Sequence, residues 1–392
     1  MYIQKVKLKQ FRNYDALELK LVPGVNLFFG PNGSGKTNLL EAVHYCALGR
    51  SHRTTQDREV IARDKELAAC GVTLQKRDGL HEVAVKLVAS GDKRKQVFID
   101  GKRAARLAGL MGTLQCVIFS PEDLDLVKDG PSVRRRFLDM LLSQLSTSYF
   151  TALQSYQQAL SQRNTLLRAL KFSESRRGAE TMDLWEDAMA KAAAIILPAR
   201  RDCCERLARE AAKRYRAISG RDEEQFSLSY LSCIENSEQI GEHMASQWAQ
   251  RREEDIRRGT TTFGLHREDI ELMIHGKDMR LFASQGQIRT AALALKLSEL
   301  SVFQELAGEP PVLLLDDVMS ELDLTRRTRL LDEIRGVQTL ITCTDESDLG
   351  QREKYYPLHV SINANGFAQV EALELADRKE RMEALDDSFL DE

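Results

Sequence analysis

The segment that most constrains the fold is 30–37, which reads Gly-Pro-Asn-Gly-Ser-Gly-Lys-Thr. It matches the phosphate-binding pattern G-x-x-x-x-G-K-[ST] at every fixed position. A short apolar stretch, 25–29, precedes it, and the spacing of 38–43 predicts a helix after it. Glycines let the backbone approach a ligand closely, and a helix N-terminus favours anions. We therefore predict a strand, a loop and a helix that together bind the phosphates of a nucleotide.

Within this loop the residue types suggest separate roles. Lys36 is expected to reach the β- and γ-phosphates, and the Thr37 hydroxyl to bind Mg²⁺. A plain glycine turn before a helix is the structural alternative, and the flanking strand and helix patterns argue against it. The predicted nucleotide-binding residues are Gly30, Pro31, Asn32, Gly33, Ser34, Gly35, Lys36, Thr37 and Asn38.

The composition is that of a soluble globular protein, with 392 residues, 43% hydrophobic and 29% charged. We see no apolar run that could span a bilayer and no signal-peptide pattern, so we expect a cytoplasmic protein. The net charge is −3, so a polyanion would have to bind at local basic patches. The 7 cysteines lack zinc-site spacing and are expected to be buried free thiols.

A second group of candidate residues follows the apolar run 311–315 near the other end of the chain. The carboxyl ends of parallel strands meet at one sheet edge, so Asp316 and Asp317 should lie beside the glycine loop. Asp316 is the candidate holder of Mg²⁺. Asp317 could orient or deprotonate an attacking water.

A third group, Ser284-Gln285-Gly286-Gln287, comes directly before a helical pattern at 288–306. Ser284 and Gly286 would form an anion site at the start of that helix. One nucleotide in one subunit does not need a second such site, so we expect it to complete the pocket of another subunit. A simple N-cap followed by a tight turn is the structural alternative.

The remaining periodicity predicts an α/β protein with a helical insertion. Helical spacing from Phe137 to Leu170, and again from Trp185 to Leu207, predicts an antiparallel hairpin, with an ordinary compact helical domain as the alternative. Pro198 predicts a kink in the second helix. Strands are expected at 2–9, 16–21, 69–75, 81–88, 96–99, 114–119, 226–230, 269–274 and 279–282. We expect head segments at 1–133 and 261–376, a helical insertion at 134–260, and a mobile acidic tail at 377–392.

Four of these segments, taken in order, resemble the Walker A, signature, Walker B and D-loop motifs of ABC-type ATPases: 30–37, 284–287, 312–317 and 320–323. The helical insertion resembles the SMC-like branch of that family. Further segments are similar to the RecF family of bacterial recombination-repair proteins: 11–14, 120–124, 130–139, 264–267 and 341–344. The resemblance covers all but the tail after about Ala376. It implies an ABC-type ATPase head, built from a P-loop α/β sheet and an antiparallel β subdomain, with an inserted helical or coiled-coil arm.

The resemblance also implies a mechanism. ATP would close a head-to-tail homodimer in which each nucleotide lies between Walker A of one subunit and the signature of the other. The closed dimer would clamp DNA near single-strand/double-strand junctions, and slow hydrolysis would release it. Arg12 would lie near the adenosine, Glu122 in a Q-loop-like segment, and Ser284 with Gly286 would touch the γ-phosphate in trans. A RecR-type recombination mediator is the implied protein partner.

Two positions depart from the wider ABC pattern. The catalytic carboxylate is usually glutamate, and Asp317 is one methylene shorter. The switch histidine is replaced, since the strand 339–343 runs into Thr344 and Asp345. A hydroxyl cannot act as a general base near neutral pH. Both departures favour a slow switch over a fast motor.

The DNA contacts are predicted from basic runs, which would bind phosphates without reading sequence. No platform of interleaved aromatic residues suggests stacking of single strands, so duplex or junction backbones are favoured. Alternatives are a transporter nucleotide-binding subunit, a nucleotide-binding kinase, and a protein in which nucleotide is only structural. The candidate residues are Arg134, Arg135, Arg136, Arg251, Arg252, Arg257 and Arg258, with Lys93, Arg94 and Lys95 as a further run.

Overall fold

The computed structural model describes residues 1–90, 94–172, 181–235, 239–349 and 355–373. They divide into two compact units. Unit 1 contains Met1–Asp123, Arg214–Arg221 and the chain from Ala292 onward, and unit 2 contains Leu124–Lys213 and Asp222–Ala291. The domain limits expected at 133/134 and 260/261 stay predictions. The expected acidic tail lies outside the described residues.

Unit 1 contains an antiparallel sheet in which the strand order is β2-β1-β4-β5-β6-β7. One face of the sheet is apolar and buried, as the alternating side chains predict. The strands expected in this region are confirmed to within two residues at each end, and β7 was not anticipated. Their bounds are β1 (Tyr2–Phe11), β2 (Tyr14–Lys20), β4 (Leu67–Lys76), β5 (Gly79–Val88), β6 (Lys95–Ile99) and β7 (Lys102–Arg103).

The second sheet of unit 1 has the order β15-β14-β3-β13-β12-β8. Its strands β14, β3, β13, β12 and β8 are parallel, and only β15 is antiparallel. The expected parallel arrangement is therefore confirmed. The carboxyl ends of β3 and β12 lie at the same edge of the sheet, with β13 between them. The bounds are β3 (Val25–Phe29), β8 (Cys116–Phe119), β12 (Val312–Asp316), β13 (Thr339–Cys343), β14 (Tyr355–Ile362) and β15 (Ala368–Ala372).

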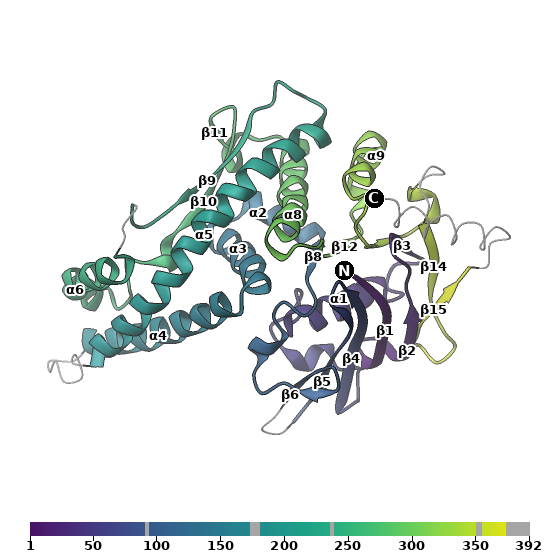
Figure 1. Cartoon of the computed structure of the whole chain (residues 1–392), viewed down its shortest axis with the longest axis horizontal. Helices are drawn as coiled ribbons and strands as arrows, with labels where there is room; N and C mark the ends of the chain where they lie inside the picture. Colours follow the sequence, from purple (N-terminus) through teal and green to yellow (C-terminus); the bar gives the residue numbers. More distant parts are fainter. Residues whose placement is uncertain (91–93, 173–180, 236–238, 350–354, 374–392) are drawn as a thin grey trace. The chain divides into compact units, whose positions relative to one another are not determined.

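Helix α1 (Lys36–Leu48) lies between the two sheets (Figure 1). It packs against β1, β4 and β5 of the antiparallel sheet and against β8, β12 and β13 of the parallel one. Most of its residues are buried, because its sequence is apolar around nearly the whole circumference. Two sheets therefore fix the position of the helix that begins at Lys36. Unit 1 also contains α9 (Leu324–Glu333) and the later part of α8 (Gln285–Ala307).

Unit 2 is mainly helical and has one small antiparallel sheet, in the order β11-β10-β9. Helix α5 continues through Pro198, and the predicted kink there stays a prediction. The helices are α2 (Asp125–Lys128), α3 (Pro131–Leu145), α4 (Thr147–Lys171), α5 (Met182–Ser219, whose last residues from Arg214 belong to unit 1), α6 (Ile240–Arg258) and α7 (Met279–Phe282), and the strands are β9 (Phe226–Leu231), β10 (Asp269–Ile274) and β11 (Lys277–Asp278).

Two expectations for this unit are wrong. The spacing from Phe137 to Leu170 predicts one continuous helix, but the structure has two. Ser146 has an extended backbone, which separates α3 from α4. The Ser146 hydroxyl accepts a hydrogen bond from the Tyr149 N–H at 3.1 Å, so this residue caps a new helix. Residues 279–282 form helix α7, not a strand, because Asp278 caps its start by accepting from the Arg280 N–H at 2.8 Å.

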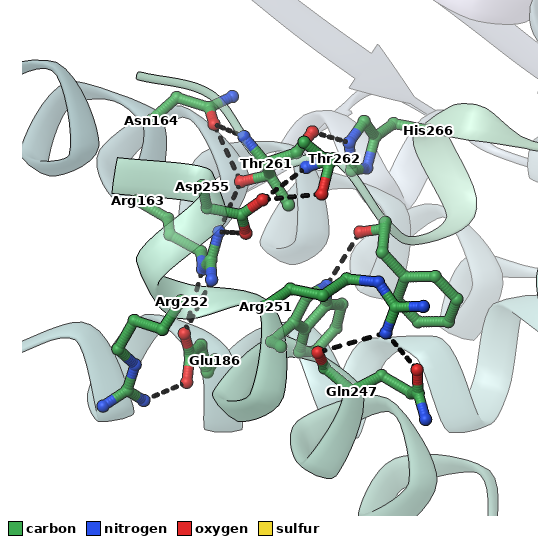
Figure 2. A network of polar contacts seen from close by, with 12 residues as sticks. Arg163, Asn164, Glu186, Gln247, Arg251, Arg252, Asp255, Thr261, Thr262 and His266 are labelled. Atoms are coloured by element: carbon green, nitrogen blue, oxygen red, sulfur yellow. Dashed lines mark hydrogen bonds and ion pairs between the residues drawn. The ribbon is translucent and has the colours of Figure 1, made fainter. Parts of the chain in front are cut away.

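A buried polar network ties three helices of unit 2 together (Figure 2). Arg163 of α4 is fully buried and donates to Glu186 of α5 at 2.8 Å and to Asp255 of α6 at 2.7 Å. A buried guanidinium requires such partners, because an unpaired charge away from water is costly. Helix α6 thus packs on the α4–α5 pair, which makes this part of unit 2 a three-helix cluster.

Candidate nucleotide-binding site

The glycine loop connects β3 to α1 with a backbone that requires glycine at two positions. Gly30 and Gly35 have φ values of 144° and 115°. A Cβ atom on Gly30 would lie 2.2 Å from the Val360 carbonyl oxygen, and one on Gly35 would lie 2.8 Å from the Asn13 side chain. Side chains at either position would therefore displace the loop.

The Lys36 side chain lies along the loop. Its ammonium group donates to the carbonyl oxygens of Gly30 at 2.6 Å and Pro31 at 2.9 Å. Burial lowers the pKa of Lys36, and the carboxylates of Asp317 and Asp316 act in the opposite direction. The lysine is therefore in the field of both acids that the sequence analysis singled out.

Hydrogen bonds connect α1, β12 and β13 through one residue of each element: Thr37, Asp316 and Thr342. The hydroxyls of Thr37 and Thr342 each donate to the same Asp316 oxygen at 2.8 Å. Burial raises the pKa of Asp316, and the two hydroxyl bonds oppose that rise. The parallel register, which places Asp316 opposite Thr342, builds this contact. We did not single out Thr342 from the sequence, although its position at the end of a buried strand could have indicated it.

Asp317 follows β12 at the edge of the parallel sheet. Its φ is 53°, an uncommon value for a residue with a side chain, and its N–H donates to the Thr342 hydroxyl at 2.9 Å. The side chain is half-buried. Thr342 thus fixes the backbone of one acid and the carboxylate of the other.

These residues fit a nucleotide with Mg²⁺. The Ser34 hydroxyl is buried and has no hydrogen-bond partner within the described part of the chain. Hydroxyl and carboxylate oxygens, as on Thr37 and Asp316, are the ligands that Mg²⁺ prefers. A glycine loop before a helix N-terminus is an anion site. The structure thus brings these residues together, and their individual roles stay predictions.

Arg12 lies beside the same helix. Its guanidinium makes two hydrogen bonds to Glu41, at 2.8 and 2.6 Å, and a third to the Glu59 carbonyl at 2.8 Å. Glu41 is fully buried and also accepts from the Ser51 hydroxyl. Burial acts to raise the Glu41 pKa, but the bonds from Arg12 and Ser51 outweigh it and hold the pKa below its usual value. We missed Glu41 in the sequence, where an acid within an apolar helix was the available signal. The predicted place of Arg12 near an adenosine stays a prediction.

Ser284 and Gly286 lie at the start of α8, in unit 2. The Ser284 hydroxyl accepts from the Gln287 N–H at 3.3 Å, and the Gln287 side chain accepts from the Ser284 N–H at 2.9 Å. This is the reciprocal capping arrangement of a helix start. Ser284 is exposed, so the cap leaves it accessible to a ligand. The predicted role in trans stays a prediction. Glu122, in unit 1, lies exposed in a short turn, Pro121–Leu124, and its charge acts on Asp316.

The basic DNA-binding candidates divide into two groups. Arg134 is buried and makes a two-point ion pair with Asp269, with both distances 2.8 Å, so it has a structural role in unit 2. Arg252 pairs with Asp183 at 2.6 Å and with Glu186. These bonds make Arg134 and Arg252 poor candidates for DNA contact.

The other candidates remain predictions. Arg135 donates to the Glu268 carbonyl, and Arg251 bonds Gln247 and lies 4.6 Å from the Phe263 ring centre. Lys95 pairs with Asp57 at 2.8 Å, and Lys93 lies outside the described residues. The remaining arginines of these runs are all exposed: Arg94, Arg136, Arg257 and Arg258.

Two general expectations can be compared with the structure. All seven cysteines are free thiols, and every one except the partly exposed Cys233 is buried, as expected. Within the described ranges, no helix combines the length and the apolar character needed to cross a bilayer.

Fold and site together define an ABC-type ATPase head with an inserted helical domain. Over residues 2–364 the sequence matches the family model of the RecF/RecN/SMC N-terminal domain, and the chain belongs to this family, in its RecF branch.

Relatives and solved structures agree with this placement. The chain is 41% identical to the DNA replication and repair protein RecF of Symbiobacterium thermophilum, over 90% of this chain and 94% of the relative. The RecF of Ruminiclostridium cellulolyticum is 39% identical over 94% and 97%. A solved structure described as the recombination mediator protein RecF-ATPrS in the RecFOR pathway has a TM-score of 0.85 and 34% identity, covering 95% of this chain and 98% of that one. The Smc head domain from Pyrococcus furiosus, 18% identical over 98% of this chain and 99% of that one with a TM-score of 0.58, shares the fold.

Proposed function

We propose that this chain is an ATP-dependent DNA-binding protein of recombinational repair and replication restart. The contact between the Thr37 hydroxyl and the Asp316 carboxylate, 2.8 Å apart beside the glycine loop, carries the nucleotide part of the proposal. The repair part is supported by the RecF relatives and by two solved structures described as RecF-ATPrS and RecF-ATP. We also propose a cytoplasmic location, where DNA is accessible.

In the proposed site, different residues bind different parts of the nucleotide. The loop amides and Lys36 hold the phosphates, and Thr37 with Asp316 holds Mg²⁺, which neutralises charge on the phosphate oxygens. Arg12 lies near the adenosine, and Asp317 orients the attacking water. Hydrolysis is slow, because the Asp317 carboxylate is short and Thr344 replaces a histidine. The proposed activity is therefore a weak ATPase that DNA stimulates.

The proposed dimer explains the second anion site. Ser284 and Gly286 of one subunit contact the γ-phosphate held by Lys36 of the other, so ATP closes a homodimer. The accessible position of Ser284 at a helix N-terminus supports this assignment. The closed dimer clamps DNA at gaps or single-strand/double-strand junctions, and a RecR-type mediator binds it there to help recombinase loading.

Light scattering of the Asp317→Asn protein with Mg-ATP, with and without a gapped DNA duplex, tests the proposal. We expect a shift from monomer to dimer with ATP and a further increase in mass with DNA. Lys36→Ala is the control, which should stay monomeric because it lacks the ammonium group that binds the phosphates. A protein that binds ATP, stays monomeric and ignores the duplex would rule out the clamp.

Three alternative functions can be distinguished from the proposed one. A transporter nucleotide-binding subunit is not favoured, because the relatives are RecF proteins. A kinase-like protein would bind ATP as a monomer and phosphorylate an acceptor. A protein that uses nucleotide only as a structural ligand would show no ATP turnover even with DNA present.

A further inference from the structure

The β1–β2 turn contacts the glycine loop from behind. The Asn13 side-chain amide donates to the Ser34 carbonyl oxygen at 3.2 Å, and the Tyr14 hydroxyl donates to the Gly35 carbonyl oxygen at 3.1 Å. Two consecutive residues of one turn thus hold two consecutive carbonyls of the loop. Tyr14 is fully buried, so its hydroxyl has a fixed direction.

The direction of a carbonyl fixes the direction of an N–H. A trans peptide is planar, and its C=O and N–H point to opposite sides. The Ser34 carbonyl shares its peptide with the Gly35 N–H, and the Gly35 carbonyl shares its peptide with the Lys36 N–H. The bond to the Ser34 carbonyl therefore points the Gly35 N–H away from the turn. The Gly35 carbonyl also accepts from the Leu39 N–H at 3.1 Å, and this bond and the one from Tyr14 together point the Lys36 N–H away from the turn. These amides are at the start of α1, where no intrahelical acceptor exists for them.

Asn13 itself accepts two hydrogen bonds. Its side-chain oxygen accepts from the Asn38 amide at 2.8 Å, and the Asn38 oxygen accepts from Arg53 at 2.9 Å. The Asn13 backbone carbonyl accepts from the Ala368 N–H at 2.8 Å. A Cβ on Gly35 would lie only 2.8 Å from the Asn13 side chain. The turn and the loop therefore fit each other closely.

We propose that Asn13 and Tyr14 are positioning residues of the phosphate site, which aim the N–H groups of Gly35 and Lys36 at the phosphate chain of the nucleotide. The inference rests on the proposed nucleotide binding and adds a second sequence segment to the loop. The buried Ser34 hydroxyl, which has no partner among the described residues, lies in the same loop and is a further donor for that ligand. A loop aligned in advance loses less conformational freedom on binding.

The test compares Tyr14→Phe and Asn13→Leu with the wild-type protein, using calorimetric binding of Mg-ATP and of magnesium tripolyphosphate. Tyr14→Phe removes one hydroxyl and keeps the ring that fills the core. Both ligands should bind more weakly by the same factor, about three- to tenfold, because the amides contact phosphates only. Tyr45→Phe is the matched control, since its buried hydroxyl bonds Asp57 and not the loop.

A second measurement separates positioning from simple stability. In ¹⁵N-glycine-labelled protein, tripolyphosphate should shift the Gly35 amide resonance of the wild type, and Tyr14→Phe should reduce that shift while the protein remains folded. Wild-type affinity for tripolyphosphate in folded Tyr14→Phe and Asn13→Leu proteins would overturn the inference and leave the proposed function intact. A wild-type protein that binds neither ligand would instead overturn the proposed function.

Discussion

The hydroxyl of Thr37 lies 2.8 Å from a carboxylate oxygen of Asp316, although 279 positions separate the two residues in the chain. Strand β13 lies between β3 and β12 and supplies Thr342, which donates to the same oxygen and accepts from the Asp317 N–H. Three separate segments therefore define one oxygen-rich point at the sheet edge. Thr342 connects the two acids there, and this connection can be tested.

Replacement of Thr342 by valine should lower both stability and turnover. The change keeps the shape but leaves the Asp317 N–H without its acceptor, at a cost of about 1–3 kcal/mol. ATP hydrolysis should fall more than ATP affinity, because Asp317 is no longer supported while the glycine loop is unchanged. Chemical unfolding and single-turnover kinetics measure the two effects. Thr339→Val is the control on the same strand, where the hydroxyl bonds only a backbone carbonyl. Unchanged turnover in folded Thr342→Val would contradict the assigned role.

Ser284→Arg should block dimerisation and leave nucleotide binding nearly unchanged. Its large side chain would fill the accessible start of α8, whereas Lys36 and Thr37 of the same subunit remain intact. The variant also lacks a helix cap, worth about 1 kcal/mol. Gln287→Ala removes the other bond of this reciprocal cap, from the Ser284 N–H to the Gln287 side chain, without adding bulk, so it is the control for light scattering with Mg-ATP. A normal dimer of Ser284→Arg would disprove the role of the signature in trans.

The contribution of Glu299 to the free energy of unfolding should decrease as the pH rises from about 4.5 to 7. Burial raises the pKa of this carboxyl from 4.5 to about 7, and the nearby Lys296 ammonium opposes the rise. This carboxyl in the folded protein therefore binds a proton over a range in which it has released it in the unfolded chain, so its contribution to stability falls as the pH increases. The effect is on the order of 3 kcal/mol at most.

Glu299→Gln tests this assignment. The free energy of unfolding of the wild type minus that of Glu299→Gln, measured with denaturant at pH 5, 6, 7 and 8, should fall as the pH rises. The same difference taken with Glu305→Gln, at an exposed position of the same helix, should stay flat. Groups that all three proteins share cancel in these differences, among them Asp123, whose pKa burial raises, and His52 and His266, whose pKa burial lowers to about 4. The same slope in Glu299→Gln as in the wild type would assign the titration to another group.

Arginine substitutions should separate folding from DNA binding. Alanine at Arg136, Arg257 and Arg258 should weaken duplex binding and reduce the salt dependence, by a slope of about 0.9 for each phosphate that is no longer neutralised. Arg134→Ala should instead destabilise unit 2 by about 3–5 kcal/mol, because it leaves the Asp269 carboxylate without its ion-pair partner. Fluorescence anisotropy over a salt series, paired with thermal unfolding, measures both. An unchanged salt slope in the triple variant would exclude these three residues.

The sequence predicted the elements whose patterns are local. The glycine loop, the strand before it and the apolar strand that ends at Asp316 follow from residue type and spacing, so their bounds agree closely. The break at Ser146 could not be predicted from helical spacing, because α4 continues the apolar seam of α3. The capping bond that Ser146 accepts from the Tyr149 N–H marks the start of the second helix.

The supporting residues of the site depend on tertiary contacts. Asn13 and Glu41 are polar groups whose partners lie on other segments, at Ser34 and Arg12. Nothing in their local spacing indicates those partners. The basic runs show the reverse case, since Arg134 and Arg136 look alike in the sequence. In the structure Arg134 is buried and bonds Asp269 and two backbone carbonyls, whereas Arg136 is exposed.

The strand order of the parallel sheet also bears on how the protein is made. Strand β3 lies between β13 and β14, so both of its neighbours are synthesised roughly 300 residues after it, which corresponds to roughly 15–60 s at ribosomal speed. The antiparallel sheet has all its strands within the first 103 residues and can form much earlier. During translation the antiparallel sheet can therefore be complete while the parallel sheet, which contains the strand before the glycine loop, still lacks most of its strands. Leu27 and Phe28, both buried in the folded protein, lack the neighbouring strands β13 and β14 during that interval, so this apolar segment is exposed while the chain is made.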